Sequence, residues 1–223
     1  MRDDVRQLLL DALPRVATRM KAHNATVPTT RLGEIAHLRP AMEEALSVAA
    51  SDLDMAVVVR KEHPFKCTEW ESRASVDLGI GCPPDVTPVF CELKWGNSAT
   101  ALGECSWDLA KMGLAVSVNA CSAAALVAGA PQRRWEQAGL EGPELFVSGQ
   151  HSFDHVRGPL YLERYWKAYA REGLPQPRKL PAAFQTSLLY KGEMDFDDGI
   201  WELRCLEVTP VGELVPVAPL PSS

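Results

Sequence analysis

The sequence has no apolar run of the ~18 residues that a membrane-spanning helix requires. Its start also lacks the pattern of a secretory signal peptide, because Asp3 and Asp4 come before the first apolar residues. These two absences predict a cytoplasmic protein that makes no membrane contact.

Two common catalytic motifs are missing as well. No Gly-x-x-x-x-Gly-Lys segment occurs, which argues against nucleotide hydrolysis of the phosphate-binding-loop type. No Gly-x-Ser-x-Gly elbow occurs, which argues against a serine hydrolase of that type. The six cysteines form no Cys-x-x-Cys pair and show no regular spacing, so we expect free thiols rather than a disulfide framework or a zinc site.

Basic residues are fewer than acidic ones, with 23 Lys and Arg against 29 Asp and Glu. The formal net charge is −6, which argues against non-specific wrapping of nucleic acid. A nuclease remains compatible with this charge, since a metal site concentrates carboxylates while a local basic patch binds phosphates. The hydrophobic fraction of 46% is sufficient for a core, and the length suits one domain with an appendage.

Two neighbouring strands are predicted over residues 73–81 and 87–96, which alternate or run apolar and end at glycine. Side chains two apart on a strand share a face, so Glu92 and Lys94 point the same way. On the first strand we expect Asp77 on one face and Val76, Leu78 and Ile80 on the other. The hairpin can thus bring two carboxylates and an ammonium together, and a divalent cation between Asp77 and Glu92 would relieve their burial.

An acid on one strand followed by Glu-x-Lys on the next resembles the active-site hairpin of the PD-(D/E)xK, or restriction-endonuclease-like, nuclease superfamily. The resemblance covers roughly residues 30–130, with Val76 where the superfamily usually has proline. It implies an α/β fold, with a restriction-endonuclease-like mixed sheet flanked by helices and a C-terminal α+β extension. It further implies Mg²⁺ or Mn²⁺ as cofactor, Asp77, Glu92 and the Leu93 carbonyl as ligands, and Lys94 as the residue that orients water.

The superfamily often adds a carboxylate from the first helix. Glu34, Glu43 and Glu44 are the candidates on the predicted helix, and we favour Glu43 or Glu44 because Glu43 borders the apolar face. The alternative is that two adjacent glutamates form a solvated face.

Basic residues elsewhere suggest contacts to a nucleic-acid strand. One set lies on a predicted helix rich in tyrosine and tryptophan, and the other follows a buried strand. The alternative is that the aromatics are core and the cations are solvated. The candidate contacts are Arg133, Arg134, Arg164, Lys167 and Arg171.

A polar stripe of Glu104, Asp108 and Lys111 is predicted on the helix after the motif. We interpret it as a surface salt-bridge stripe.

The remaining elements follow from periodicity and from glycine and proline positions. The proposed division is a core over 1–130, an extension of the same domain over 131–209, and a proline-rich tail over 210–223. Helices are predicted over 2–22 (interrupted near Pro14), 31–49, 97–117, 132–139 and 160–172, and further strands over 56–59, 124–129, 144–148, 184–190 and 201–208.

The sequence therefore predicts a Mg²⁺-dependent nuclease that hydrolyses phosphodiester bonds of DNA, with RNA as another substrate to consider. One alternative is a catalytically silent protein of the same fold that binds a protein or a nucleic acid. Another is an unrelated α/β protein in which Glu92 and Lys94 form a structural ion pair.

Overall fold

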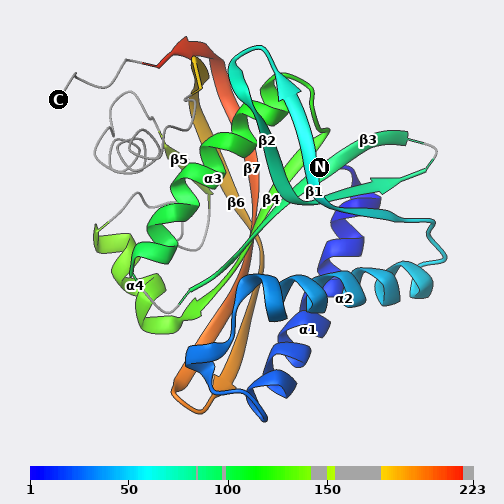
Figure 1. The fold of residues 1–223 in the computed structure, drawn as a ribbon, viewed down its shortest axis with the longest axis vertical. Coiled ribbons are helices and arrows are strands. Elements are labelled where there is room, and N and C mark those ends of the chain that lie inside the picture. Colours follow the sequence, from blue (N-terminus) through cyan, green and yellow to red (C-terminus); the bar gives the residue numbers. More distant parts are fainter. Residues whose placement is uncertain (84, 97–98, 142–149, 154–176, 218–223) are drawn as a thin grey trace.

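The computed structural model describes residues 1–83, 85–96, 99–141, 150–153 and 177–217. Its centre is a seven-stranded sheet with the order β1-β2-β3-β4-β7-β6-β5 (Figure 1). The strands are β1 Val58–Cys67, β2 Trp70–Cys82, β3 Asp85–Trp95, β4 Ala123–Pro131, β5 Gln150–Phe153, β6 Lys179–Phe196 and β7 Gly199–Pro216.

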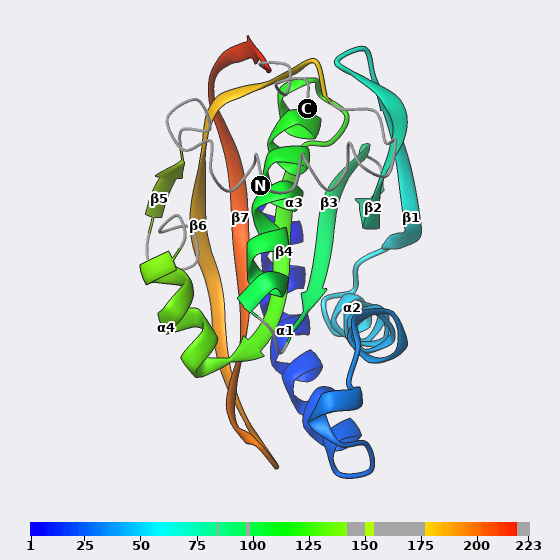
Figure 2. The same ribbon diagram turned by 60° about the vertical axis from the view of Figure 1, so that its left-hand side comes forward.

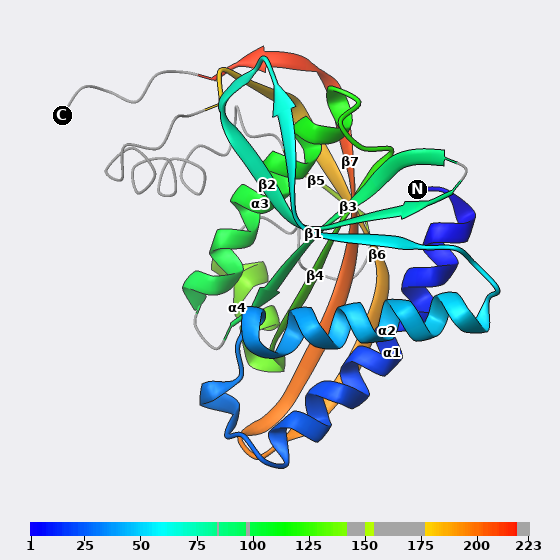
Figure 3. The same cartoon turned by 45° about the vertical axis from the view of Figure 1, so that its right-hand side comes forward.

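Helices cover both faces of this sheet. Helices α1 (Asp3–Asn24) and α2 (Arg39–Asp52) lie side by side on one face (Figure 3). Helix α3 (Ala99–Ser117) runs along the other face, and α4 (Gln132–Glu141) follows β4 on that side (Figure 2). Two short helical segments, η1 (Thr29–Arg31) and η2 (Glu34–Leu38), connect α1 to α2.

Each face buries its own hydrophobic core. The α1/α2-side core joins those helices to sheet residues such as Leu78, Cys91, Leu93 and Cys205. The α3-side core joins α3 to sheet residues such as Phe90, Leu126, Leu206 and Val208. The alternation along β3 between Phe90, Cys91 and Leu93 reflects the two-residue period of a strand with both faces covered.

The connections explain why the sheet is mixed. Strands β1, β2 and β3 form an antiparallel meander, whereas β4 pairs with β3 in parallel. A parallel pair requires a crossover, and α3 provides it. The predicted mixed α/β architecture with flanking helices is therefore confirmed, and β6 and β7 of the predicted extension belong to the same sheet.

Several predicted boundaries were wrong. Helix α1 continues through Pro14, although a proline in a helix interior removes one backbone donor and crowds the carbonyl four residues before it, and residues on both sides of it, such as Leu13 and Val16, are packed in the core. The proline-rich tail was predicted to begin at Pro210, yet β7 continues to Pro216 and pairs with β6. Beyond Val208, β7 pairs with β6 but no longer with β4. A proline in this part of β7 therefore removes no hydrogen bond to β4.

The predicted strand 144–148 and the predicted helix 160–172 lie outside the described residues. Among the helices of the described ranges, none combines the length and the apolar character needed to cross a membrane.

One packing contact fixes the end of β3 that carries the candidate site. The ring of Trp95 stacks on Trp201, with centroids 4.9 Å apart and planes at 14°. Gly129 of β4 lies opposite Trp95, and a Cβ atom there would stand 2.2 Å from that ring. Glycine is thus required for the close approach that holds Trp95, and with it the neighbouring Lys94, in place.

Candidate functional site

Strand β3 directs Glu92 and Lys94 toward the α3 face, as the two-residue spacing predicts. Glu92 is 4% exposed, and the Lys94 side chain is also largely covered. The intervening Leu93 and the preceding Cys91 point into the α1/α2-side core. The Glu92 carboxylate and the Lys94 ammonium therefore lie between the sheet and helix α3 rather than on a solvent-exposed edge strand.

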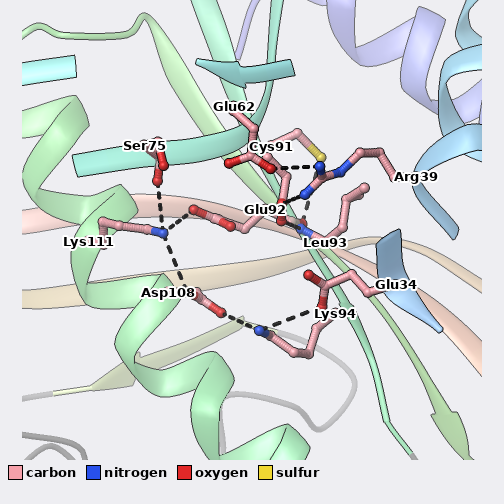
Figure 4. Close-up of polar contacts among 11 residues, drawn as sticks. Glu34, Arg39, Glu62, Ser75, Cys91, Glu92, Leu93, Lys94, Asp108 and Lys111 are labelled. Carbon is pink, nitrogen blue, oxygen red and sulfur yellow. Dashed lines mark hydrogen bonds and ion pairs between the residues drawn. The ribbon is translucent and has the colours of Figure 1, made fainter. Parts of the chain in front are cut away.

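Asp77 of β2 joins the same neighbourhood. The β2–β3 register pairs Leu78 with Cys91, so the next position along both strands brings Asp77 beside Glu92. The Asp77 Oδ2 atom accepts a hydrogen bond from the backbone N–H of Leu93 at 2.8 Å. The hairpin therefore brings Asp77 and the Glu92–Lys94 segment together as predicted. Figure 4 shows Glu92, Leu93 and Lys94 of this segment with their polar neighbours.

Strand β2 changes course at Asp77, which corrects one prediction. Val76 packs in the α3-side core, whereas Leu78 and Ile80 pack in the α1/α2-side core, so these three do not share a face. Opposite this point on β1, Glu62 has φ 45°, and the β1–β2 ladder pairs Lys61 with Leu78 and His63 with Val76, in one register on both sides of Asp77. A left-handed residue twists the ladder locally, and this redirects the strand.

Helix α2 supplies a basic partner for Asp77. Arg39 stands at the start of that helix and forms an ion pair with the Asp77 Oδ1 atom. Its Nη1 atom lies 2.6 Å from the Glu62 Oε1 atom. Burial acts to lower the pKa of Arg39, but the carboxylates of Asp77 and Glu62 outweigh it and raise that pKa. The guanidinium is thus fixed in its charged form between two strands.

Helix α3 contributes two residues that sequence reasoning assigned to a surface stripe. Asp108 is buried, and the Lys111 ammonium forms an ion pair with Glu92 and donates to the Ser75 carbonyl at 3.1 Å. The Asp108 Oδ2 atom lies 3.4 Å from the Lys94 ammonium. The surface interpretation was wrong for both residues, because α3 turns this side toward the sheet; the Glu104 side chain is outside the description.

A signal for these two residues exists in the sequence. Asp108 and Lys111 are flanked by Leu109, Ala110 and Met112, all of which are buried. A helix that is apolar on most of its surface has little contact with solvent, so Asp108 and Lys111 within it are expected to be buried. Buried charges need partners, and these are expected from the strand that the helix faces.

In the first helical region, Glu34 contacts Lys94, whereas the two favoured residues, Glu43 and Glu44, pair elsewhere. The Glu34 Oε2 atom lies 3.6 Å from the Lys94 ammonium, and burial raises the pKa of Glu34. Glu43 instead pairs with Lys61 at 2.7 Å, and Glu44 pairs with Arg19 at 3.2 Å. The preference for Glu43 or Glu44 is therefore not supported by the geometry, since the segment Glu34–Leu38 forms a separate turn that reaches β3.

The electrostatics single out Glu92. Burial raises the pKa of Glu92 well above its ordinary value, and repulsion from Asp108 and Asp77 adds to this, while the Lys111 ammonium opposes it. Within the described residues, the Glu92 Oε1 atom and the Asp108 Oδ2 atom are buried and make no hydrogen bond, although each contacts an ammonium. Buried groups with strongly shifted pKa values are concentrated at functional sites.

The donor set suits a hard divalent cation in its chemistry. Asp77, Glu92 and Asp108 offer carboxylate oxygens, which Mg²⁺ and Mn²⁺ prefer. The Leu93 peptide, predicted to contribute its carbonyl, lies beside Asp77 through the N–H contact. Among the described residues, however, no three His, Cys, Asp or Glu side chains stand in a metal-holding arrangement. A cation at this site would therefore require the basic partners of Asp77 and Glu92 to move.

The predicted nucleic-acid contacts are only partly described. Arg133 is exposed and Arg134 is partly buried at the start of α4. Arg164, Lys167 and Arg171 lie outside the described residues. Comparison of the chain with protein-family models, curated proteins and solved structures found no match in any of the three. The interpretation of the site therefore depends on its geometry.

Proposed function

We propose that the chain is a Mg²⁺- or Mn²⁺-dependent nuclease that hydrolyses phosphodiester bonds of DNA and has a restriction-endonuclease-like fold. The observation that carries this proposal is that Asp77 bonds the backbone of the Glu92–Lys94 segment, while the side chains of Glu92 and Lys94 contact Lys111 and Asp108 of α3. The order of α2, a three-strand meander, α3 and the parallel strand β4 supports it, since it matches the order implied by the resemblance.

Each residue has a defined role in this proposal. Asp77 and Glu92 would hold the cation through hard oxygen donors. The bound ion would polarise the scissile phosphate and lower the pKa of a bound water. Lys94, positioned between Glu34 and Asp108, would orient the attacking water and offset the negative charge that develops on the phosphate.

The test is cleavage of duplex DNA in the presence of Mg²⁺ or Mn²⁺. Glu92→Gln and Lys94→Met should each lower the rate by at least about a hundredfold, because each removes a charge that acts in the transition state. Glu43→Gln and Lys61→Met provide matched controls, since this carboxylate and ammonium pair lies on neighbouring elements outside the cluster. Full activity in either site variant would remove the assignment.

A second candidate function is a catalytically silent protein of this fold that binds a protein or a nucleic acid. The observation in its favour is that Asp77 and Glu92 each contact a basic side chain, Arg39 and Lys111 respectively. The net charge of −6 suits a basic protein partner. This candidate predicts no cleavage with any divalent cation, together with binding that does not respond to Mg²⁺.

A further inference from the structure

The ammonium of Lys111 lies where oxygen atoms from three elements converge. It contacts the Glu92 Oε1 atom from β3, the Ser75 carbonyl from β2 at 3.1 Å, and the Asp108 Oδ1 atom of its own helix at 3.5 Å (Figure 4). Its side chain is 13% exposed. Carboxylate and carbonyl oxygens are also the ligands that hard cations prefer, so the protein places its own cation among oxygen donors suited to a metal.

The contacts show why this ammonium can be exchanged. A divalent ion carries twice its charge and so attracts Glu92 more strongly from the same side. Lysine has a flexible four-carbon stem, and Asp108 lies three residues before Lys111 on the helix. The ammonium can therefore leave Glu92 and keep a carboxylate partner. Asp108 also contacts Lys94. An ammonium of Lys111 that moves from Glu92 to Asp108 therefore stays next to Lys94, the residue proposed to face the scissile phosphate.

We propose that Lys111 is the resident counter-ion of Glu92, that a divalent metal ion displaces it, and that the displaced ammonium then binds a phosphate of the nucleic-acid strand. This inference rests on the proposed function. Lys111 would thereby act as a positioning residue that couples two binding events. Metal binding would increase affinity for nucleic acid and, by reciprocity, nucleic acid would increase affinity for the metal.

The first test measures Mn²⁺ binding by calorimetry with no nucleic acid present. Lys111→Met and Lys111→Gln remove the competing charge, so each should bind Mn²⁺ at least about tenfold more tightly than the unsubstituted protein. Lys111→Arg keeps the positive charge, so its affinity for Mn²⁺ should not increase. An unchanged or weaker affinity in the two neutral variants would overturn the inference, because a purely structural lysine would loosen the site when removed.

Lys191→Met is the matched control. Its ammonium lies 2.8 Å from Glu202, a buried carboxylate on the same face of the sheet, but it is outside the cluster. Removing it should leave Mn²⁺ affinity unchanged. A gain equal to that of Lys111→Met would show that any lost lysine strengthens metal binding through net charge alone, and would also overturn the inference.

The second test addresses the phosphate contact. It uses the Lys94→Met background, in which the proposed function predicts cleavage slowed at least about a hundredfold, and measures binding of a short DNA duplex by fluorescence anisotropy. Mn²⁺ should raise DNA affinity at least about fivefold in this background, and the gain should disappear when Lys111→Met is added. A gain that persists without Lys111 would overturn the phosphate contact.

Failure of the inference can be told apart from failure of the proposed function. If Mn²⁺ binds and the binding is lost in Asp77→Asn and Glu92→Gln, but Lys111→Met does not tighten it, only the inference fails. If Mn²⁺ does not bind the unsubstituted protein, or if binding survives both carboxylate substitutions, both fail.

Discussion

The carboxylate of Asp77 accepts a hydrogen bond from the backbone N–H of Leu93, with 2.8 Å between Oδ2 and the nitrogen. A side chain therefore supplies a cross-strand bond at the point where β2 turns away from β3. The other carboxylate oxygen pairs with Arg39 of α2. One buried carboxylate thus connects two strands and a helix, and the same group is the first proposed metal ligand.

Asp77→Ala should therefore reduce the free energy of unfolding substantially. Removal of one partner from a buried ion pair costs up to about 3–5 kcal/mol when the remaining charge is left unpaired, and the loss here should lie near the lower end because Arg39 keeps Glu62 as a partner. Asp77→Asn should cost less, since the amide oxygen can still accept from Leu93. Urea denaturation measures both.

Asp52 provides the comparison for this measurement. It pairs with Arg15 at 2.5 Å, but both side chains are about half exposed. Asp52→Ala should cost less than about 1 kcal/mol. Equal losses at Asp52 and Asp77 would contradict the structural role assigned to the buried pair.

The meeting of Asp77 with Glu92 and Lys94 could be predicted because it depends on local features. The two strands are adjacent in sequence, and the two-residue period fixes which side chains share a face. The exception at Val76 could not be predicted, since it follows from the left-handed conformation of Glu62 on a third strand. Glutamate rarely adopts that conformation, so its sequence gives no indication of it.

The partners of the carboxylates depend on how helices pack, which the motif does not specify. Asp108 and Lys111 have the spacing of an exposed ion pair; their apolar neighbours indicate a buried position, but the strand residues that they contact follow from the docking of α3 on the sheet. Arg39 reaches Asp77 because η2 turns the chain between α1 and α2. The same turn brings Glu34, rather than Glu43, beside Lys94. Such contacts depend on tertiary structure and not on local pattern.

The position of Glu34 gives a second prediction. Glu34→Gln should lower the rate of DNA cleavage by about tenfold or more, because Glu34 helps to orient the Lys94 ammonium. Glu43→Gln should leave the rate within about twofold, because Glu43 pairs with Lys61 away from the cluster. Single-turnover cleavage assays on the two variants make the comparison, and equal effects would refute a specific role for Glu34.

Glu92 predicts a dependence of stability on pH. Its pKa in the folded protein is raised well above the ordinary value of 4.5, chiefly by burial. The folded state therefore holds a proton that the unfolded state has already released. Stability accordingly falls as the pH rises above 4.5, and the fall continues until the pH passes the folded pKa.

Glu92→Gln removes this penalty because glutamine does not ionise. The unfolding free energy of the variant, minus that of the unsubstituted protein, should thus increase as the pH rises above 4.5, by at most about 1.4 kcal/mol per pH unit, and should level off once the pH passes the folded pKa. Urea denaturation at several pH values, with no divalent cation present, measures this difference. A difference that stays constant over the range would show that Glu92 ionises as readily in the folded protein as in the unfolded chain.

The fourth prediction is that Mg²⁺ or Mn²⁺ stabilises the folded protein through Asp77 and Glu92. Two buried carboxylates near each other disfavour the metal-free fold, although Arg39 and Lys111 reduce that cost. A cation that binds only the folded form, at a hundredfold excess over its Kd, adds roughly 2.7 kcal/mol. Each kcal/mol moves the Tm of a chain of this size by roughly 2–4 °C, so a rise of about 5–11 °C is expected.

Thermal melts with each cation then distinguish the proposed nuclease from the two alternatives, a silent protein of the same fold and an unrelated α/β protein. A nuclease site predicts the rise in the unsubstituted protein and its loss in Asp77→Asn, which keeps the shape of the side chain without its charge. A silent protein of the same fold predicts no rise in either, because Arg39 and Lys111 stay on their carboxylates. An unrelated protein with purely structural ion pairs predicts a small decrease in Tm on adding salt. This decrease should be equal for sodium and magnesium at matched ionic strength, since screening depends on ionic strength and not on the ion. A flat melt in the unsubstituted protein would therefore exclude the metal site directly, before any cleavage is measured.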